Sequence, residues 1–288
     1  MPPIRTRRFL QLAGVTLATV ALAACGKKEP PPPPAPAAVA SAPAPAPAKV
    51  YVVGTDAAYA PFESQNEKAE IVGFDIEVVQ AVAKKAGLEV KFVNTPWEGI
   101  FNALGQGDRD MVLSAVTITA ERKQTMDFSD PYFDAQQLIA VKANSKVAKF
   151  ADLKKLKVGV QTGTTGDEAV AKLQGKTSAN IKRFESTPLA LKELESGGVD
   201  AVVADNGVVI HYVANNPGGK FKTVADKEFV PEQYGIALKK GNAELLAKIN
   251  KGLADIKADG SYDAIFVKYF GAPPAKAAAA PAPAASTK

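Results

Sequence analysis

The feature that most constrains the fold is an alternation of short apolar runs with amphipathic segments, which occurs twice along the chain. The apolar runs are rich in β-branched residues, and the segments between them have helical periodicity and end at glycine. In the first round the order strand, helix, strand, helix, strand is predicted over residues 50–53, 76–86, 90–93, 98–104 and 111–116. Because consecutive parallel strands need a crossover helix between them, this order predicts a parallel α/β sheet.

The alternation starts again in the second half of the chain. The elements predicted there are a strand at 156–160, helices at 167–173 and 187–195, and a buried strand at 199–204. Strand-like runs flank this region at 136–141 and 233–238, and two helices at 243–258 and 261–269 follow. The same α/β class therefore describes the whole body of the chain.

The first 25 residues have the composition of an export signal. Three arginines, Arg5, Arg7 and Arg8, precede an apolar stretch at 9–24 that is too short to span a membrane comfortably. The stretch ends in Leu-Ala-Ala-Cys, which resembles a bacterial lipobox, and this implies that Cys25 is acylated and tethers the chain to a membrane. The alternative is an ordinary buried thiol in an uncleaved apolar segment.

Proline and alanine dominate the chain on both sides of the predicted body. Residues 26–48 predict a stiff, extended linker, and residues 272–288 predict a disordered tail, which leaves 49–271 as the folded part. The net charge of +5 falls to +2 without the three signal arginines, a balance that gives no reason to expect nucleic-acid binding. One cysteine and one histidine exclude a disulfide framework and disfavour Cys/His metal sites, so no cofactor is predicted.

Residues 110–132 contain the first candidate site. The strand predicted at 111–116 leads through a threonine-rich bend into a short helix, for which Thr119 is the expected N-cap. Ser114, Thr117 and Arg122 then lie at the carboxyl end of a strand, where open α/β sheets bind ligands. A guanidinium beside hydroxyls and free helix N–H groups suits a planar carboxylate. The alternative is a solvated surface arginine.

Two further segments offer polar groups after predicted strands. The Gly/Thr loop at 161–166 resembles a phosphate loop but lacks its Lys-Ser/Thr ending, so we reject a nucleotide site there. Such a loop before a helix can still present N–H groups to a carboxylate. Asp205 follows the strand predicted at 199–204, and an N-cap of the next helix is its plain alternative role.

A resemblance becomes clear when the motifs are taken together. They are, in chain order, TDAAYAPFE, VGFDIEV, SAVTITAERK, MDFSDPYF, VGVQTGTTGDEA, VDAVVADN and YGIALKK. The chain resembles the family 3 extracellular solute-binding proteins of bacterial ABC importers, in the branch that binds polar amino acids. It is most similar to glutamine-, histidine- and lysine/arginine/ornithine-binding proteins. The resemblance covers residues 49–271 with few gaps.

The resemblance implies a type II periplasmic binding protein, with two α/β lobes, a ligand cleft and a two-strand hinge. Lobe 1 would comprise residues 49–138 and 234–271, and lobe 2 residues 139–233, with hinge strands near 137–141 and 234–238. It also implies a monomer in the periplasm that works with the permease subunits of an ABC transporter. Hinge closure around the ligand is the expected motion.

The resemblance also assigns roles to single residues. It implies that Arg122 binds the ligand α-carboxylate and that Asp205 pairs with the α-ammonium. Positions that match contacts to the ligand backbone are Ser114, Ala115 and Thr117, and Thr164 and Thr165 match a lobe 2 loop that also touches the carboxylate. Positions that match contacts around the ligand side chain are Asp56, Tyr59, Trp97 and Gln161. Gln161 departs from glutamine binders, which carry lysine there.

The sequence leaves alternatives open for both the ligand and the function. A carboxylate at Asp56 near two aromatic rings favours a basic side chain, through an ion pair and cation–π stacking, although glutamine could use the same groups. An enzyme similar to cyclohexadienyl dehydratase is an alternative on the same fold, but the one histidine, His211, has the pattern of a surface or packing residue. A sensory module would need a transmembrane segment after the body, and none is evident.

Overall fold

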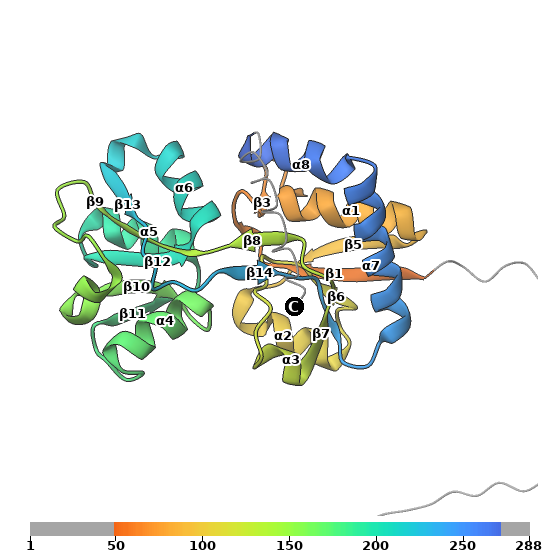
Figure 1. The fold of residues 1–288 in the computed structure, drawn as a ribbon, viewed down its shortest axis with the longest axis horizontal. Helices are drawn as coiled ribbons and strands as arrows, with labels where there is room; N and C mark the ends of the chain where they lie inside the picture. Colours follow the sequence, from red (N-terminus) through yellow and green to blue (C-terminus); the bar gives the residue numbers. More distant parts are fainter. Residues whose placement is uncertain (1–48, 272–288) are drawn as a thin grey trace, which may run out of the picture. The chain divides into compact units, whose positions relative to one another are not determined.

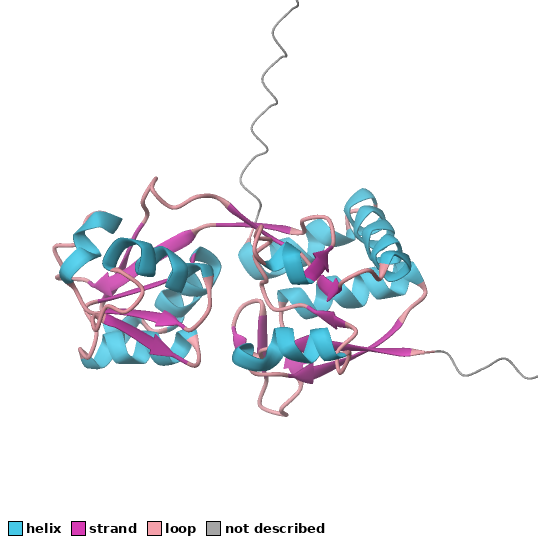
Figure 2. Cartoon of the chain, turned by 90° about the horizontal axis from the view of Figure 1, so that it is seen from below, coloured by secondary structure: helices cyan, strands magenta, loops and turns pink. Residues whose placement is uncertain are grey.

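The computed structural model describes residues 49–271, so the predicted signal segment with Cys25, the linker and the Ala/Pro tail lie outside the described residues. Within this range the chain forms two lobes, each built on its own five-stranded sheet (Figure 1). Helices lie on both faces of the strands in each lobe (Figure 2). The α/β class is therefore confirmed.

The first lobe contains the alternation predicted from the N-terminal half. Its sheet has the order β5 (Glu89–Asn94), β1 (Val50–Thr55), β6 (Met111–Val112), β15 (Ala237–Lys239) and β7 (Met126–Phe128). The strand β1 is parallel to β5 and β6, whereas β15 is antiparallel to β6 and β7. The longer helices of this lobe are α1 (Phe74–Ala86), α2 (Trp97–Gln106), α7 (Ala243–Ala258) and α8 (Ser261–Phe270). A left-handed glycine ends each of α1 and α2, as the sequence predicts for α1.

The second lobe repeats the arrangement on a separate sheet. Its strand order is β11 (Ile181–Phe184), β10 (Val158–Gln161), β12 (Ala201–Asp205), β9 (Gln137–Lys142) and β13 (Phe221–Val224). The strands β11, β10 and β12 are parallel, and β9 is antiparallel to β12. Its helices are α4 (Thr165–Gln174), α5 (Thr187–Ser196) and α6 (Asn206–Asn215), with 3-10 turns at Phe150–Lys155 and Pro217–Gly219.

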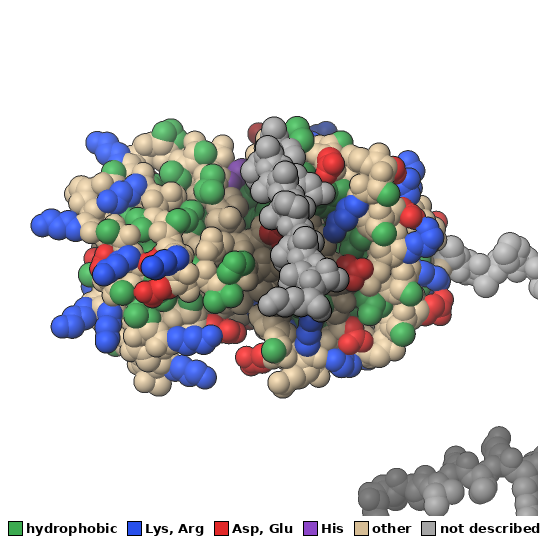
Figure 3. Space-filling model, in the orientation of Figure 1, with side chains coloured by type: hydrophobic (Ala, Val, Ile, Leu, Met, Phe, Trp, Pro, Cys, Tyr) green, Lys and Arg blue, Asp and Glu red, His purple; other side chains and the backbone are tan. Residues whose placement is uncertain are grey.

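Each lobe has its own core. In the first lobe, rings pack around Phe62, Phe74 and Phe133, with edge-to-face contacts between Phe62 and both other rings. In the second lobe, aliphatic side chains such as Ile139 and Val160 pack on one face of the sheet, and a second cluster covers the other face. On the face shown in Figure 3, lysine and arginine prevail on the second lobe, whereas both signs of charge are mixed on the first.

Two antiparallel strands, β8 (Phe133–Ala135) and β14 (Glu232–Tyr234), run side by side between the lobes. The hinge strands predicted near 137–141 and 234–238 adjoin this pair along the chain, and their role as a hinge stays a prediction. The strand β9 pairs along its length within the second sheet, and β15 pairs within the first. Gly235 and Ile236 separate β14 from β15, and a side chain at position 235 would meet Ile118 Cδ1 at 2.8 Å, so glycine fits this close approach.

The structure corrects two local predictions around residue 115. The strand predicted at 111–116 ends after Val112, because Ala115 has φ +47°, a left-handed conformation that an extended strand does not contain. The helix predicted from Ala120 is the four-residue α3 (Arg122–Thr125), although Thr119 Oγ1 does accept a hydrogen bond from the Arg122 N–H at 3.1 Å.

The short strands β2 (Ala58–Tyr59), β3 (Glu63–Gln65) and β4 (Ile71–Val72) form a small additional sheet that the sequence did not indicate. Each helix between residues 49 and 271 is too short or too polar to cross a bilayer.

Candidate ligand-binding cleft

The structure brings all eleven predicted site residues to one cavity. The first lobe contributes Asp56, Tyr59, Trp97, Ser114, Ala115, Thr117 and Arg122, and the second lobe contributes Gln161, Thr164, Thr165 and Asp205. A ligand in it would touch both lobes at once.

Arg122 is half-buried against a pair of aromatic rings. The guanidinium carbon lies 5.3 Å from the ring centre of Trp97 and 5.2 Å from that of Phe101. One terminal nitrogen donates to the Thr117 carbonyl at 3.0 Å, and the other reaches the Gly163 carbonyl of the second lobe at 3.3 Å. Burial lowers the pKa of Arg122, and nearby carboxylates oppose this shift, so the side chain stays a cation. Its fixed, stacked geometry differs from that of a solvated surface arginine.

Asp205 ends β12 and faces the cavity. It stands at the N-cap position of α6, but its side chain makes no capping hydrogen bond, so the plain capping role is wrong. Instead its carboxylate accepts from the Tyr59 hydroxyl at 2.7 Å and from the Gln137 amide. Burial raises the pKa of Asp205. Among residues 49–271 no lysine or arginine forms an ion pair with it.

Asp56 provides a second carboxylate on the first-lobe side. It accepts from the Gln161 amide of the second lobe at 3.3 Å, and burial raises its pKa. The Gln161 amide oxygen in turn accepts from the Thr187 hydroxyl at 3.0 Å, which orients the amide group. The cavity therefore contains one cation, two carboxylates and the aromatic walls of Tyr59 and Trp97.

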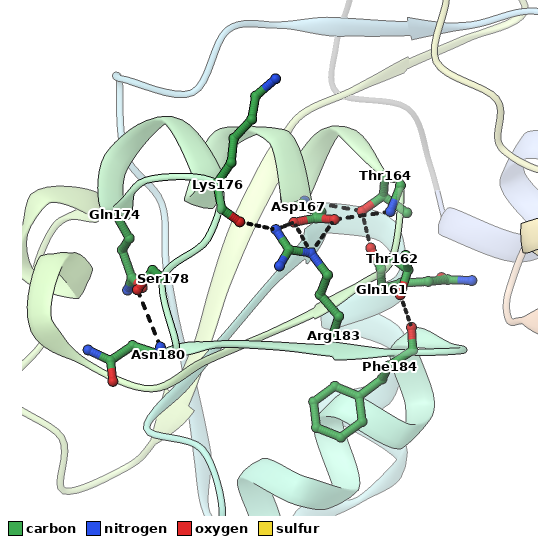
Figure 4. Close-up of polar contacts among 11 residues, drawn as sticks. Gln161, Thr162, Thr164, Asp167, Gln174, Lys176, Ser178, Asn180, Arg183 and Phe184 are labelled. Carbon is green, nitrogen blue, oxygen red and sulfur yellow. Dashed lines mark hydrogen bonds and ion pairs between the residues drawn. The ribbon is translucent and has the colours of Figure 1, made fainter.

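The loop before α4 forms part of the second-lobe wall of the cavity, beside Arg122. Thr164 caps α4, since its hydroxyl accepts from the Asp167 N–H at 3.2 Å. Asp167 also accepts from the Gly163 N–H at 3.1 Å and forms an ion pair of 2.8 Å with Arg183 of β11 (Figure 4). The positive charge of Arg183 thus balances the negative charge of Asp167, which accepts a hydrogen bond from the loop. A helix N-terminus next to a guanidinium forms a favourable environment for a carboxylate.

Two buried acids that the sequence analysis missed form hydrogen bonds to the first-lobe wall of the cavity. Glu63 Oε1 accepts from the Ser114 hydroxyl at 2.8 Å, and Asp75 Oδ2 accepts from the Ala115 N–H at 2.9 Å. Asp75 also accepts from the Tyr132 hydroxyl at 2.7 Å. Both acids are fully buried, and burial raises the pKa of each; the nearby charge of Asp75 raises the pKa of Glu63 further.

This support has an energetic role. A non-glycine residue in the left-handed region costs roughly 1 kcal/mol, and such strain persists only where the surroundings impose it. The bond from the Ala115 N–H to Asp75 fixes that conformation, and the bond from Ser114 to Glu63 fixes the preceding residue. The wall of the cavity is preorganised in this way.

The comparison with known proteins agrees with this architecture. Residues 51–272 match the family model described as bacterial extracellular solute-binding proteins, family 3. The chain belongs to this family. A probable histidine-binding protein of Neisseria gonorrhoeae is 44% identical over 259 residues, which are 90% of this chain and 94% of the relative.

Two further members of the family extend the comparison. The ABC transporter arginine-binding protein 1 of Escherichia coli (strain K12) is 33% identical over 219 residues, which are 75% of this chain and 89% of the relative. The crystal structure of ArtJ from Geobacillus stearothermophilus, an arginine-, lysine-, histidine-binding protein, has a TM-score of 0.76 and 47% identity. It covers 79% of this chain and 97% of its own. This likeness confirms the two-lobed fold.

His211 does not line this cavity. It lies on α6 beside a separate groove, and burial lowers its pKa. In the part of the chain that the structure describes, no group of three acids, histidines or cysteines is arranged to hold a metal ion. The polar groups of the cleft are thus an arginine, carboxylates, hydroxyls and amides.

Proposed function

We propose that this chain is the substrate-binding component of a bacterial ABC importer, which captures an L-amino acid between its lobes and delivers it to a membrane permease. The observation that carries the proposal is the placement of Arg122 and Asp205 on opposite lobes around one cavity. A bidentate guanidinium suits the α-carboxylate of an amino acid, and a carboxylate suits its α-ammonium.

The same arrangement couples binding to closure. A zwitterion that touches Arg122 in the first lobe and Asp205 in the second interacts with both charges only when the lobes are close together. This difference in affinity between two conformers is what drives closure. Contacts such as that between the Tyr59 hydroxyl and Asp205 already join the lobes in this structure.

We propose a basic amino acid as the ligand. Once Arg122 and Asp205 hold the two ends of the zwitterion, the carboxylate of Asp56 is left for the ligand side chain, with Tyr59 and Trp97 as aromatic walls. Names of the relatives mention histidine and arginine. Glutamine is the rival ligand, since its amide could hydrogen-bond to Asp56 and Gln161. The names describe binding proteins, so the relatives do not favour the dehydratase alternative.

The test is a thermal-shift screen of the twenty amino acids and ornithine, followed by calorimetry on the best ligand. Arginine, lysine, ornithine or histidine should give the largest shift. Arg122→Ala should weaken this binding strongly while the protein stays folded, and the neighbouring exposed Lys123→Ala should leave it unchanged. Equal affinity of Arg122→Ala and the parent protein would reject the role of Arg122, and no response to any amino acid would reject the proposal.

The predicted localisation is part of the same proposal. We propose that Cys25 carries a lipid that holds the protein at a membrane facing the periplasm, and that the described lobes work as a monomer beside the permease. Cys25→Ser should move the protein from the membrane fraction to the soluble fraction. Retention of this variant in the membrane would contradict the anchor, and a concentration-independent dimer in light scattering would contradict the monomer.

A further inference from the structure

Glu232 was not marked by the sequence and does not line the cavity, yet it connects its two sides. It is the first residue of β14, one of the two strands that run between the lobes. Its side chain is partly buried behind the wall of the cleft. No role follows for it from the fold alone.

The contacts of the Glu232 carboxylate come from both lobes. Oε2 accepts from the Thr117 hydroxyl of the first lobe at 2.7 Å and from the Thr165 hydroxyl of the second at 2.9 Å. Oε1 accepts from the Gln137 amide at 3.2 Å. Both threonines line the cavity, so one carboxylate joins a cleft hydroxyl from each lobe.

The partly buried charge of Glu232 needs these three hydrogen-bond donors. Burial raises the pKa of Glu232 and the nearby charge of Asp205 raises it further, while the three donors lower it. A partly buried carboxylate is costly unless its oxygens are hydrogen-bonded. Among residues 49–271 Glu232 forms no ion pair, so its charge depends on hydroxyl and amide donors. Separation of the lobes would move Thr117 away from Thr165 and Gln137, so the carboxylate could not keep all three donors.

The direction of the two hydroxyl bonds also matters for the ligand. Each threonine hydroxyl has one hydrogen and two lone pairs. Because Thr117 and Thr165 both donate to Glu232, their oxygens keep lone pairs with which to accept, and Thr165 uses one of its two for the Gln137 amide at 3.1 Å. A hydroxyl fixed in this way accepts a hydrogen bond and suits the N–H groups of an ammonium.

We infer that Glu232 is a positioning residue that stabilises the closed conformation and orients Thr117 and Thr165 as acceptors for the ligand. The part of this inference that concerns the ligand rests on the proposed function. The part that concerns closure does not, because the contacts of Glu232 are all within the chain.

The first experiment measures binding of the amino acid selected by the thermal-shift screen. Glu232→Ala should weaken affinity roughly 10- to 100-fold, mainly through faster dissociation, because two oriented hydrogen bonds are lost. Glu232→Gln should rescue much of the affinity, since its amide oxygen can accept from both hydroxyls and only the bond from the Gln137 amide loses its acceptor. Glu228→Ala, which removes an exposed acid from the same segment, is the matched control and should have no effect. Affinity of Glu232→Ala within about twofold of the parent protein would overturn the inference.

A double-mutant cycle tests whether Glu232 acts through the threonine. Thr165→Val and Glu232→Ala should be strongly non-additive, because each removes the same bond. Additive losses would mean that Glu232 does not act through Thr165. Urea unfolding of each ligand-free variant separates this effect from a general loss of stability, which would not change dissociation from the folded protein.

A third measurement needs no ligand. Spin labels at cysteines replacing the exposed Glu98 on α2 and Lys172 on α4, with Cys25→Ser in all proteins, report the distance between the lobes. Glu232→Ala should shift the ligand-free distribution toward longer distances, and Glu232→Gln should not. An unchanged distribution would overturn the role in closure. If no amino acid binds the parent protein, the proposed function fails while this measurement still decides on Glu232.

Discussion

The two sides of the cleft are supported in different ways. The first-lobe wall at Ser114 and Ala115 rests on two fully buried acids, Glu63 and Asp75, deep in an aromatic core. The second-lobe loop before α4 rests on Asp167, whose partner Arg183 has a side chain that is 34% exposed. A buried bond that loses its partner is far more costly than a surface ion pair. We therefore expect the first lobe to preorganise the site and the second lobe to adapt to the ligand.

The largest expected effect comes from the charge that the second lobe supplies. Asp205→Ala should weaken amino-acid binding by about 3–5 kcal/mol, because the ligand ammonium would be buried without its counter-ion. Isothermal titration calorimetry measures this loss. The exposed Asp200→Ala at the other end of the same strand region is the control and should bind normally. A loss under about 1 kcal/mol would be the size expected for a helix cap and would contradict the account.

The buried support of the first lobe should matter for folding as well as binding. Asp75→Ala leaves the Ala115 N–H and the Tyr132 hydroxyl without their acceptor, so the free energy of unfolding should fall by about 2–4 kcal/mol. Urea denaturation measures the loss. Asp134→Ala removes an exposed acid from the same region and should change stability by less than about 0.5 kcal/mol. Equal stabilities of the two variants would contradict the supporting role of Asp75.

Acid pH should weaken binding. Burial raises the pKa of Asp205 in the ligand-free protein, as it does for Asp56 in the same cleft and for Glu232 behind its wall. The positive charge of Arg122 opposes the shift. Below this raised pKa the ligand ammonium must displace a proton, so affinity should fall by up to about tenfold for each pH unit. Calorimetry in buffers of different ionisation enthalpy should detect proton release on binding at mildly acidic pH.

The same pKa shifts predict the opposite trend for stability without ligand. A buried acid with a raised pKa in the folded state binds a proton more tightly there than in the unfolded chain. The stabilisation is present at low pH and is lost as pH rises from the unfolded to the folded pKa. For Asp75 this loss lies between pH 3.8 and about 6, so the urea midpoint of the ligand-free protein should fall over that range. A rise over this range, or affinity that does not change with pH, would contradict the placement of these acids.

The smallest effect is expected for Arg183, whose partly exposed ion pair with Asp167 supports the second-lobe loop. Arg183→Ala should weaken binding by about 1 kcal/mol or less, because solvent screens the pair with Asp167. The effect should decrease with added salt. Lys182→Ala, an exposed neighbour on the same strand, is the control. A loss as large as that of Asp75→Ala would remove the contrast between the two sides.

The sequence predicted those parts of the structure that local signals determine. The helix predicted at 243–258 agrees with α7, and Gly87 ends α1 as expected. All eleven predicted site residues meet at one cavity. They could be predicted because the family motifs occur in order along the chain, and their roles with a ligand stay predictions. The strand predicted at 111–116 was too long because an apolar run of residues does not indicate that Ala115 has a left-handed conformation.

The supporting residues were missed because their partners lie far along the chain. Ala115 and Asp75 are 40 residues apart, and Thr117 and Glu232 are 115 apart. Short strands such as β2 and β8 have too few residues to show a period. A signal was still present for Glu63 and Asp75, since each is an acid next to an apolar residue in a recognised motif.

The central claim is that Arg122 and Asp205 hold opposite ends of one zwitterion. Calorimetry with the selected amino acid, its α-methyl ester and its Nα-acetyl derivative, on the parent protein and on Arg122→Ala and Asp205→Ala, tests it most directly. The account predicts that the parent protein rejects both derivatives, that Arg122→Ala no longer distinguishes the ester, and that Asp205→Ala no longer distinguishes the acetyl form. If each variant still discriminates against its own derivative as strongly as the parent protein does, the account is contradicted.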